Sequence, residues 1–132
     1  MMCGFLFLES VKKPLLIDEF TRALEKQSWR GPDASHVRNV NNQFLLGHNR
    51  LSIIDPEEIS DQPMASREGR FTIIFNGEIY NHKELKSELG LNTKTFSDTE
   101  VILEGYASIG NEIFSRLDGM FSLVIVDSYN NS

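Results

Sequence analysis

Apolar runs of strand length recur along this chain, and turn-forming residues separate them. The runs cover residues 4–9, 37–40, 44–47, 71–75 and 121–126. Asn41-Asn42 lies between the second and third runs, and this spacing predicts a β-hairpin. Short apolar runs bounded by turns in this way predict β-strands.

Three other segments show the pattern of helices. Pro14 opens a stretch in which Leu16, Phe20 and Leu24 recur every four residues. A short helix is predicted over residues 82–89, ended by Gly90. Ser97-Asp98-Thr99-Glu100 has the sequence of a capping box ahead of an apolar helix over residues 101–109, which Gly110 ends. Strands and helices segregated in this way favour an α+β fold.

Composition narrows the classes of function. The 132 residues predict one domain. A net charge of −6 argues against binding to nucleic acid or to an anionic membrane surface. No segment approaches the ~18 apolar residues of a membrane span. Cys3 is the single cysteine, which excludes an internal disulfide and fits a reducing, cytoplasmic location. His36, His48 and His82 lack the close spacing of metal ligands, so we expect no metal site.

Cys3 has two interpretations. A lone cysteine in an apolar strand is usually a small buried hydrophobic residue. Cys3 lies so near the N-terminus, however, that removal of the preceding methionines would place an α-amino group on the same residue as the thiol. That amine, with a pKa of about 7.7–8.0, can act as a general base and activate the thiol as a nucleophile.

Asn76-Gly77 follows an apolar strand and also has two interpretations. The pair favours tight turns, and spacing alone favours the turn. The functional alternative is an oxyanion hole, in which the Asn amide and the Gly backbone N–H stabilise a tetrahedral intermediate.

Several charged residues fit either a solvated surface or an amino-acid ligand. Arg50 is suited to an α-carboxylate, and Glu78 and Asp98 are suited to an α-ammonium group. Asp98 could equally belong to the helix cap. Arg30 and Asp33 are expected to hold the turn between them.

Taken in order, the motifs resemble one known family. They are Cys3-Gly4-Phe5, Arg30-Gly31-Pro32-Asp33, Arg50-Leu51-Ser52-Ile53-Ile54-Asp55, Gln62-Pro63-Met64, Asn76-Gly77-Glu78-Ile79-Tyr80-Asn81, Ser97-Asp98-Thr99-Glu100 and Leu117-Asp118-Gly119-Met120-Phe121. Together they resemble the class II glutamine amidotransferase (glutaminase) domain of glutamine-dependent asparagine synthetases. The resemblance covers nearly the whole chain.

The resemblance implies a role for each matching residue. Cys3 would attack the side-chain amide of L-glutamine, release ammonia and leave a thioester that water hydrolyses. Asn76 and Gly77 would form the oxyanion hole, and Glu78 and Asp98 would face the substrate α-amine. The residues that would bind the rest of the substrate are Arg50, Leu51, Ser52, Ile53 and Ile54. The residues that would form a structural turn near the site are Arg30, Gly31 and Asp33.

The resemblance also implies an N-terminal nucleophile hydrolase fold, an αββα sandwich of antiparallel sheets. Residues 1–132 would form one glutaminase domain, incomplete at its C-terminal side relative to the family and without a synthetase domain. We therefore expect no cofactor in this chain, with ATP and Mg²⁺ used only by a separate synthetase domain or subunit that receives the ammonia.

Met1-Met2 before Cys3 keeps a different class of function open. In the family the cysteine follows the initiator methionine directly, whereas here a second methionine precedes it. If both methionines are retained, Cys3 has no free α-amine, and the chain would be a non-catalytic module that binds glutamine or docks a partner. A third alternative is a homo-oligomer that pairs exposed strand edges.

Overall fold

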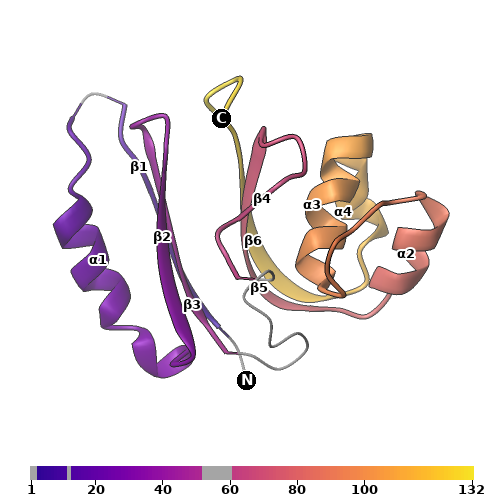
Figure 1. Ribbon diagram of the computed structural model, residues 1–132, viewed down its shortest axis with the longest axis horizontal. Coiled ribbons are helices and arrows are strands. Elements are labelled where there is room, and N and C mark those ends of the chain that lie inside the picture. The colour runs from indigo at the N-terminus through magenta and orange to yellow at the C-terminus, as the bar shows by residue number, and fades with distance from the viewer. Residues whose placement is uncertain (1–2, 12, 52–60) are drawn as a thin grey trace.

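The chain forms two three-stranded antiparallel sheets that pack face to face, with helices on both outer sides (Figure 1). The computed structural model describes residues 3–11, 13–51 and 61–132. The elements are β1 (Gly4–Glu9), α1 (Ile17–Glu25), a 3-10 turn (Ser28–Arg30), β2 (Ala34–Val40), β3 (Phe44–Arg50), β4 (Met64–Ala65), β5 (Phe71–Ile79), α2 (His82–Glu88), α3 (Asp98–Ile109), α4 (Glu112–Arg116) and β6 (Gly119–Asp127).

The first sheet has the order β1-β3-β2 and is covered on its outer face by α1. The predicted hairpin between β2 and β3 is confirmed: Asn41 and Asn42 both have positive φ, and Val40 pairs with Phe44. Gly47 allows α1 to approach, because a Cβ there would lie 2.8 Å from the side chains of Phe20 and Leu24.

The second sheet has the order β4-β5-β6, and α3 packs on its outer face. The core between this sheet and α3 consists of Met64, Phe71, Ile73, Phe75, Ile79, Ile102 and Leu103. Side chains alternate along β5, so the residues between these face the other sheet. Ile74 accordingly packs with Leu46 of β3 and Val126 of β6 in the layer between the sheets.

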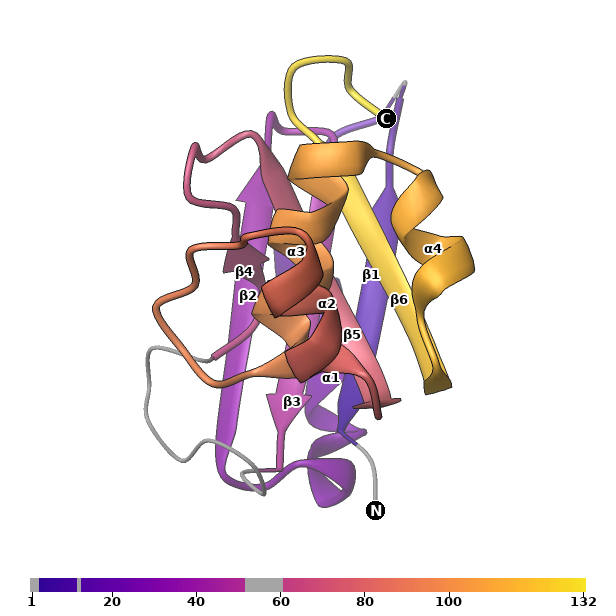
Figure 2. The ribbon, with the colours of Figure 1, turned by 90° about the vertical axis from the view of Figure 1, so that its right-hand side faces the viewer.

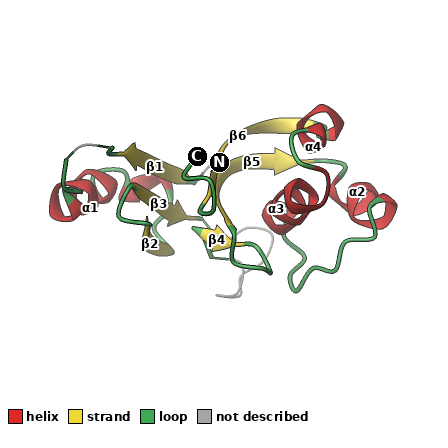
Figure 3. Cartoon of the chain, turned by 90° about the horizontal axis from the view of Figure 1, so that it is seen from above, coloured by secondary structure: helices red, strands yellow, loops and turns green. Residues whose placement is uncertain are grey.

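The layers therefore run helix, sheet, sheet, helix, as the view from above shows (Figure 3). This confirms the predicted α+β class and its αββα sandwich of antiparallel sheets. Phe5 and Phe7 of β1 pack against the layer between the sheets. Because that layer is apolar along most of its length, each polar side chain within it requires a specific explanation.

Two local predictions were wrong. Asn76-Gly77 is no turn; it lies inside β5, paired with Ser122 and Phe121 of β6, because the strand continues to Ile79. The first helix begins at Ile17 rather than Pro14, and Leu16 before it is 58% exposed.

The capping box forms only in part. Ser97 Oγ accepts from the N–H of Thr99, but the carboxylate of Glu100 accepts from the N–H groups of Lys94 and Thr95. Glu100 therefore stabilises the loop that leads into α3 rather than the backbone of Ser97. The sequence patterns also missed α4 and β4, both of which are short.

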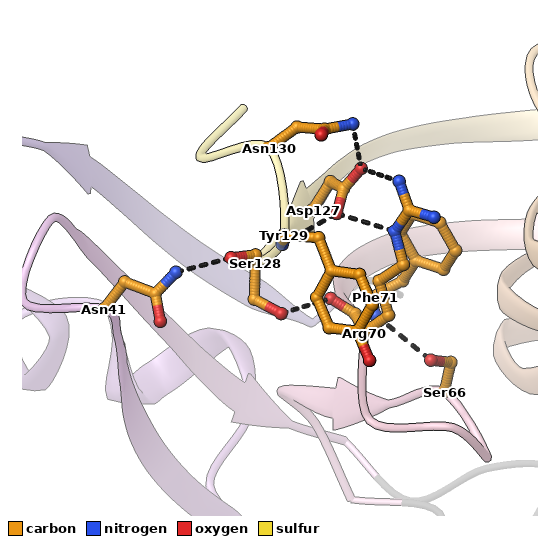
Figure 4. A network of polar contacts seen from close by, with 8 residues as sticks. All are labelled: Asn41, Ser66, Arg70, Phe71, Asp127, Ser128, Tyr129 and Asn130. Atoms are coloured by element: carbon orange, nitrogen blue, oxygen red, sulfur yellow. Dashed lines mark hydrogen bonds and ion pairs between the residues drawn. The ribbon is translucent and has the colours of Figure 1, made fainter.

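A polar cluster ties the two sheets together at one end of the sandwich (Figure 4). Arg70 and Asp127 form a bidentate ion pair, with N–O distances of 2.9 and 2.6 Å. Tyr129 lies against the Arg70 guanidinium, and Asn41 of the β2–β3 hairpin donates to the carbonyl of Ser128 at 2.7 Å. The hairpin of the first sheet is thus fixed to the end of β6 in the second.

None of the helices among the described residues has the length and apolar character needed to cross a membrane. The same residues contain no group of three or more His, Cys, Asp or Glu side chains arranged to hold a metal ion.

Candidate active site

The sequence-predicted site residues gather at the end of the sandwich opposite the polar cluster of Figure 4. The first residues of β1 and the carboxyl ends of β3 and β5 all lie at this end (Figures 1 and 2). Gly4 pairs with Asn49 near the end of β3. Across the layer between the sheets, His48 Nε2 lies 3.1 Å from the carbonyl oxygen of Phe75 in β5.

Cys3 is half-buried immediately before β1. The backbone N–H of Leu51 donates to its Sγ at 3.2 Å. Arg30 Nε lies 3.5 Å from its carbonyl oxygen. Cys3 continues the alternation of Phe5 and Phe7, which contact the layer between the sheets, so its side chain belongs on the same inner face.

The turn after α1 packs directly on the end of β3. A Cβ at Gly31 would lie 2.2 Å from the carbonyl oxygen of Asn49, so only glycine permits this approach. Asp33 N–H donates to the carbonyl of Arg50 at 3.0 Å. The predicted structural turn therefore supports the strand that carries Arg50, and through Arg30 it also contacts Cys3.

Arg50 is buried at the end of β3 and forms an ion pair with Asp61. The other oxygen of the Asp61 carboxylate lies 2.9 Å from His36 Nε2 on β2. Arg50 follows His48 by two residues and so shares its inward-facing side of β3. Asp61 thus holds a guanidinium group in place at the open end of the layer between the sheets.

Asn76 lies on the inner face of β5, two residues beyond Ile74 of the layer between the sheets. Its Oδ1 is buried and has no hydrogen-bond partner among the described residues. Buried polar atoms are almost always paired in folded proteins, so an unpaired one calls for an explanation. Here it marks a carboxamide that the fold itself does not use.

Gly77 carries a backbone donor on the open edge of β5. Along this strand the N–H groups of Phe75 and Ile79 point away from β6, to Gln62 Oε1 at 2.6 Å and Asp98 Oδ2 at 3.0 Å. N–H directions alternate in a strand, so the Gly77 N–H lies on the same edge between them. A Cβ at Gly77 would lie 2.2 Å from the carbonyl of Met120, so this position requires glycine.

Asp98 is the first residue of α3, and its carboxylate reaches the end of β5. Burial raises the pKa of this carboxyl above its ordinary value, although the bond from Ile79 opposes that effect. Glu78 lies between Gly77 and Ile79 and is exposed. The two carboxylates therefore flank the same end of β5, one buried and one in solvent.

Residues 52–60 are not described, so the predicted positions Ser52, Ile53 and Ile54 lie outside the structure's described residues. The other predicted residues fall into two groups. The residues at the end of the first sheet are Cys3, Arg30, Gly31, Asp33, Arg50 and Leu51. Those at the end of the second sheet are Asn76, Gly77, Glu78 and Asp98. The His48 side chain joins the two groups.

Sequence reasoning missed three polar residues of this end, namely His48, Asp61 and Gln62. The spacing of the histidines bears on His48 only as a metal ligand, whereas its position two residues before Arg50 is the signal that places it on the inner face of β3. Gln62 belongs to a motif used for the family resemblance, but no role followed from it. Asp61 directly precedes Gln62, and no sequence motif indicates a role for it.

Comparison with known proteins agrees with this geometry. The family model described as "Glutamine amidotransferase domain" matches residues 2–132. Over 99% of its length the chain is 40% identical to glutamine-hydrolysing asparagine synthetases from Sandersonia aurantiaca and Zea mays, and 38% identical to one from Arabidopsis thaliana. It spans 25%, 22% and 23% of those proteins, respectively. A match over nearly every residue establishes that the chain belongs to the glutamine amidotransferase domain family.

Proposed function

We propose that this domain hydrolyses L-glutamine to L-glutamate and ammonia through a thioester on Cys3. The observation that carries the proposal is the pair of Asn76, whose buried Oδ1 has no partner among the described residues, and Gly77, whose N–H faces the edge of β5 away from β6. They lie at the same end of the sandwich as a cysteine whose sulfur already accepts a backbone hydrogen bond. A nucleophile and an oxyanion hole at one site are the two requirements of acyl transfer.

The first step would form the thioester. With Cys3 as the first residue, its α-amino group takes the thiol proton, and the sulfur attacks the side-chain carbonyl carbon of glutamine. The oxygen becomes an oxyanion that accepts hydrogen bonds from the Asn76 amide and the Gly77 N–H. The α-ammonium group then gives its proton to the leaving nitrogen. The carbon–nitrogen bond breaks, and ammonia leaves.

The second step would hydrolyse the thioester. The α-amine accepts a proton from water, and the resulting hydroxide attacks the thioester carbonyl through a second oxyanion in the same hole. Cleavage of the carbon–sulfur bond releases glutamate, and the sulfur recovers its proton. One oxyanion hole thus serves both steps, which is why removal of either donor should slow the reaction.

Substrate recognition would rest on charge. Arg50 would bind the α-carboxylate of glutamine through a guanidinium that Asp61 holds in place. Asp98 and Glu78 would face the α-ammonium group from the end of β5. Leu51 would contribute backbone groups, together with the adjoining residues 52–54.

The partner we propose is a synthetase domain, in the same polypeptide or in another subunit, that uses the ammonia for amidation. Support comes from the relatives, which carry the name asparagine synthetase and are about four times as long as this chain. We propose that ATP and Mg²⁺ belong to that partner and that this domain needs no cofactor. We also propose that the domain acts in the cytoplasm.

Intact-mass spectrometry before and after treatment with a diazo ketone analogue of glutamine tests the proposal. We expect Cys3 at the terminus and one covalent adduct, with no adduct in Cys3→Ala. A chain prepared with Cys3 first, through cleavage of a removable leader, separates processing from chemistry. If that form neither reacts nor releases ammonia from glutamine, the proposed function is wrong.

Met1-Met2 supports a second candidate, a non-catalytic module that binds glutamine or docks a partner. With both methionines retained, Cys3 has an amide in place of the general base. Calorimetry distinguishes the candidates: glutamine binding without ammonia release, in protein that keeps both methionines, favours the module. Size-exclusion chromatography at several concentrations tests whether it is a homo-oligomer.

A further inference from the structure

The peptide groups of Phe75, immediately before Asn76, are held by two buried side chains. Gln62 Oε1 accepts from the Phe75 N–H at 2.6 Å. His48 Nε2 lies 3.1 Å from the Phe75 carbonyl oxygen and donates to it. His48 is 1% exposed and Gln62 is 8% exposed, so neither bond competes much with water. We call this pair the Phe75 clamp.

The two arms of the clamp come from different parts of the fold. His48 belongs to β3, in the other sheet, where it stands opposite Phe5 of β1. Gln62 precedes β4 and donates to the Thr99 hydroxyl of α3 at 3.2 Å. The clamp therefore fixes the two peptide groups on either side of the Phe75 Cα relative to both the cysteine-bearing sheet and the helix that carries Asp98.

The histidine arm has a defined protonation state. Burial lowers the pKa of His48 to about 4, so the ring is neutral near pH 7. A neutral imidazole that donates to a carbonyl must carry its proton on Nε2, which leaves Nδ1 without a proton. Nδ1 is buried and has no partner among the described residues, so nothing in that part of the chain pulls the ring towards the other tautomer.

We propose that His48 and Gln62 are positioning residues for the oxyanion hole. They set the place of Asn76 and Gly77 opposite Cys3 by holding the Phe75 peptide groups. The inference rests on the proposed function, because it assigns the clamp to the same site. Neither residue needs to touch the substrate, since the clamp acts on the backbone one residue away.

The geometry explains why such a device is needed here. Asn76 and Gly77 belong to one sheet and Cys3 to the other, and side chains rather than a strand ladder join the two sheets. Displacement of a reacting group by about 1 Å can cost about 100-fold in rate. His48 bonds across the sheets at the site, to the Phe75 carbonyl, and Asn41 bonds across them at the opposite end, to the Ser128 carbonyl.

The test uses the chain with Cys3 as its first residue. His48→Leu removes the donor, and His48→Gln retains an amide donor near the position of Nε2. We expect kcat for glutamine hydrolysis to fall about 10- to 100-fold in His48→Leu while KM changes less than about threefold. His48→Gln should recover most of that loss. Gln62→Met, which removes the acceptor, should lower kcat in the same manner.

Leu46→Ala is the matched control. Leu46 lies on the same face of β3 two residues away, is fully buried and contacts the apolar layer rather than the site. It should destabilise the fold and lower kcat of the folded protein far less than His48→Leu does. If Leu46→Ala lowers kcat as much as His48→Leu, the effect is general loosening and the proposal is wrong.

Two further measurements distinguish loss of the clamp from a general loosening of the fold. The ¹H–¹⁵N resonances of Asn76 and Gly77 should shift in His48→Leu more than in Leu46→Ala, and unchanged resonances would overturn the clamp. If His48→Leu does not fold, His48→Asn replaces it, because its shorter amide should not support kcat as Gln does. A wild-type chain without glutaminase activity refutes the proposed function, whereas an active wild type with unimpaired His48 variants refutes only this inference.

Discussion

The Asp98 carboxylate at the start of α3 accepts a hydrogen bond of 3.0 Å from the backbone N–H of Ile79 at the end of β5. One side chain thus joins the helix to the strand that carries Asn76 and Gly77. The bond uses Oδ2 of the carboxylate. Asp98 is therefore both a structural link and the proposed acceptor for a substrate ammonium group.

Asp98→Ala should mainly raise the KM for glutamine, because it removes a charged hydrogen-bond acceptor from the bound substrate. We expect a rise of roughly 10- to 100-fold with a smaller change in kcat. Steady-state glutaminase assays measure both constants. Asp98→Asn, which retains an acceptor for Ile79 but loses the charge, should also raise KM. A loss confined to kcat in both variants would contradict the binding role.

Gly77→Ala should destabilise the domain by about 3 kcal/mol or more, because its Cβ would meet the β6 backbone and its φ is +148°. Urea unfolding followed by circular dichroism measures the change. Gly69→Ala is the control: φ there is +77°, but a Cβ would meet nothing within 4 Å. It should cost only the backbone strain, about 1–2 kcal/mol. Equal losses at the two glycines would refute the steric argument.

Acid should destabilise the domain partly through His48. Burial lowers its folded pKa from 6.5 to about 4, so the unfolded chain binds the proton first as pH falls. The stabilisation is full above about pH 6.5 and is lost as pH falls towards 4, amounting to roughly 3 kcal/mol across that window. His48→Gln should show a flatter dependence of unfolding free energy on pH between 6.5 and 4. Parallel curves for the two proteins would exclude this origin.

Asp127 should affect the stability of the domain in a lower pH range than His48 does. Its ion pair with Arg70 lowers the Asp127 pKa from 3.8 to about 2. Because the folded pKa is depressed, the stabilisation is present above about pH 4 and is lost as pH falls towards 2. Asp127→Asn should therefore lower Tm at pH 7, and its Tm should approach that of the wild type as the pH falls towards 2. A constant Tm difference throughout the range would show that the charge is not responsible.

Periodicity predicted most of the fold, because the alternation of apolar residues also determines which face of each element is buried. The strands at residues 4–9 and 121–126, the Asn41-Asn42 hairpin and the stop at Gly110 follow from local chemistry. The short elements β4 and α4 were missed because two or five residues hold too little pattern. Their formation depends on packing against neighbours that are distant in sequence.

The site was predictable as a set of residue types but not as an arrangement. Local preference favoured a turn at Asn76-Gly77, whereas pairing with β6 keeps the pair in a strand. The Gly77 donor is exposed on an edge only because β4 is too short to cover it, and no local pattern contains that information. His48 likewise acquires its partner Phe75 only when the two sheets pack together.

The layer between the sheets also determines how the activity of this domain can vary when its core residues are substituted. Its apolar side chains set how far the cysteine-bearing sheet stands from the sheet that holds Asn76. A change of volume at Phe44 or Ile74 would therefore alter the separation of Cys3 from Asn76, the proposed nucleophile and part of the proposed oxyanion hole, without touching either. Substitutions that look like ordinary core variation should appear as kinetic variation, so the interior and the chemistry of this domain must evolve together.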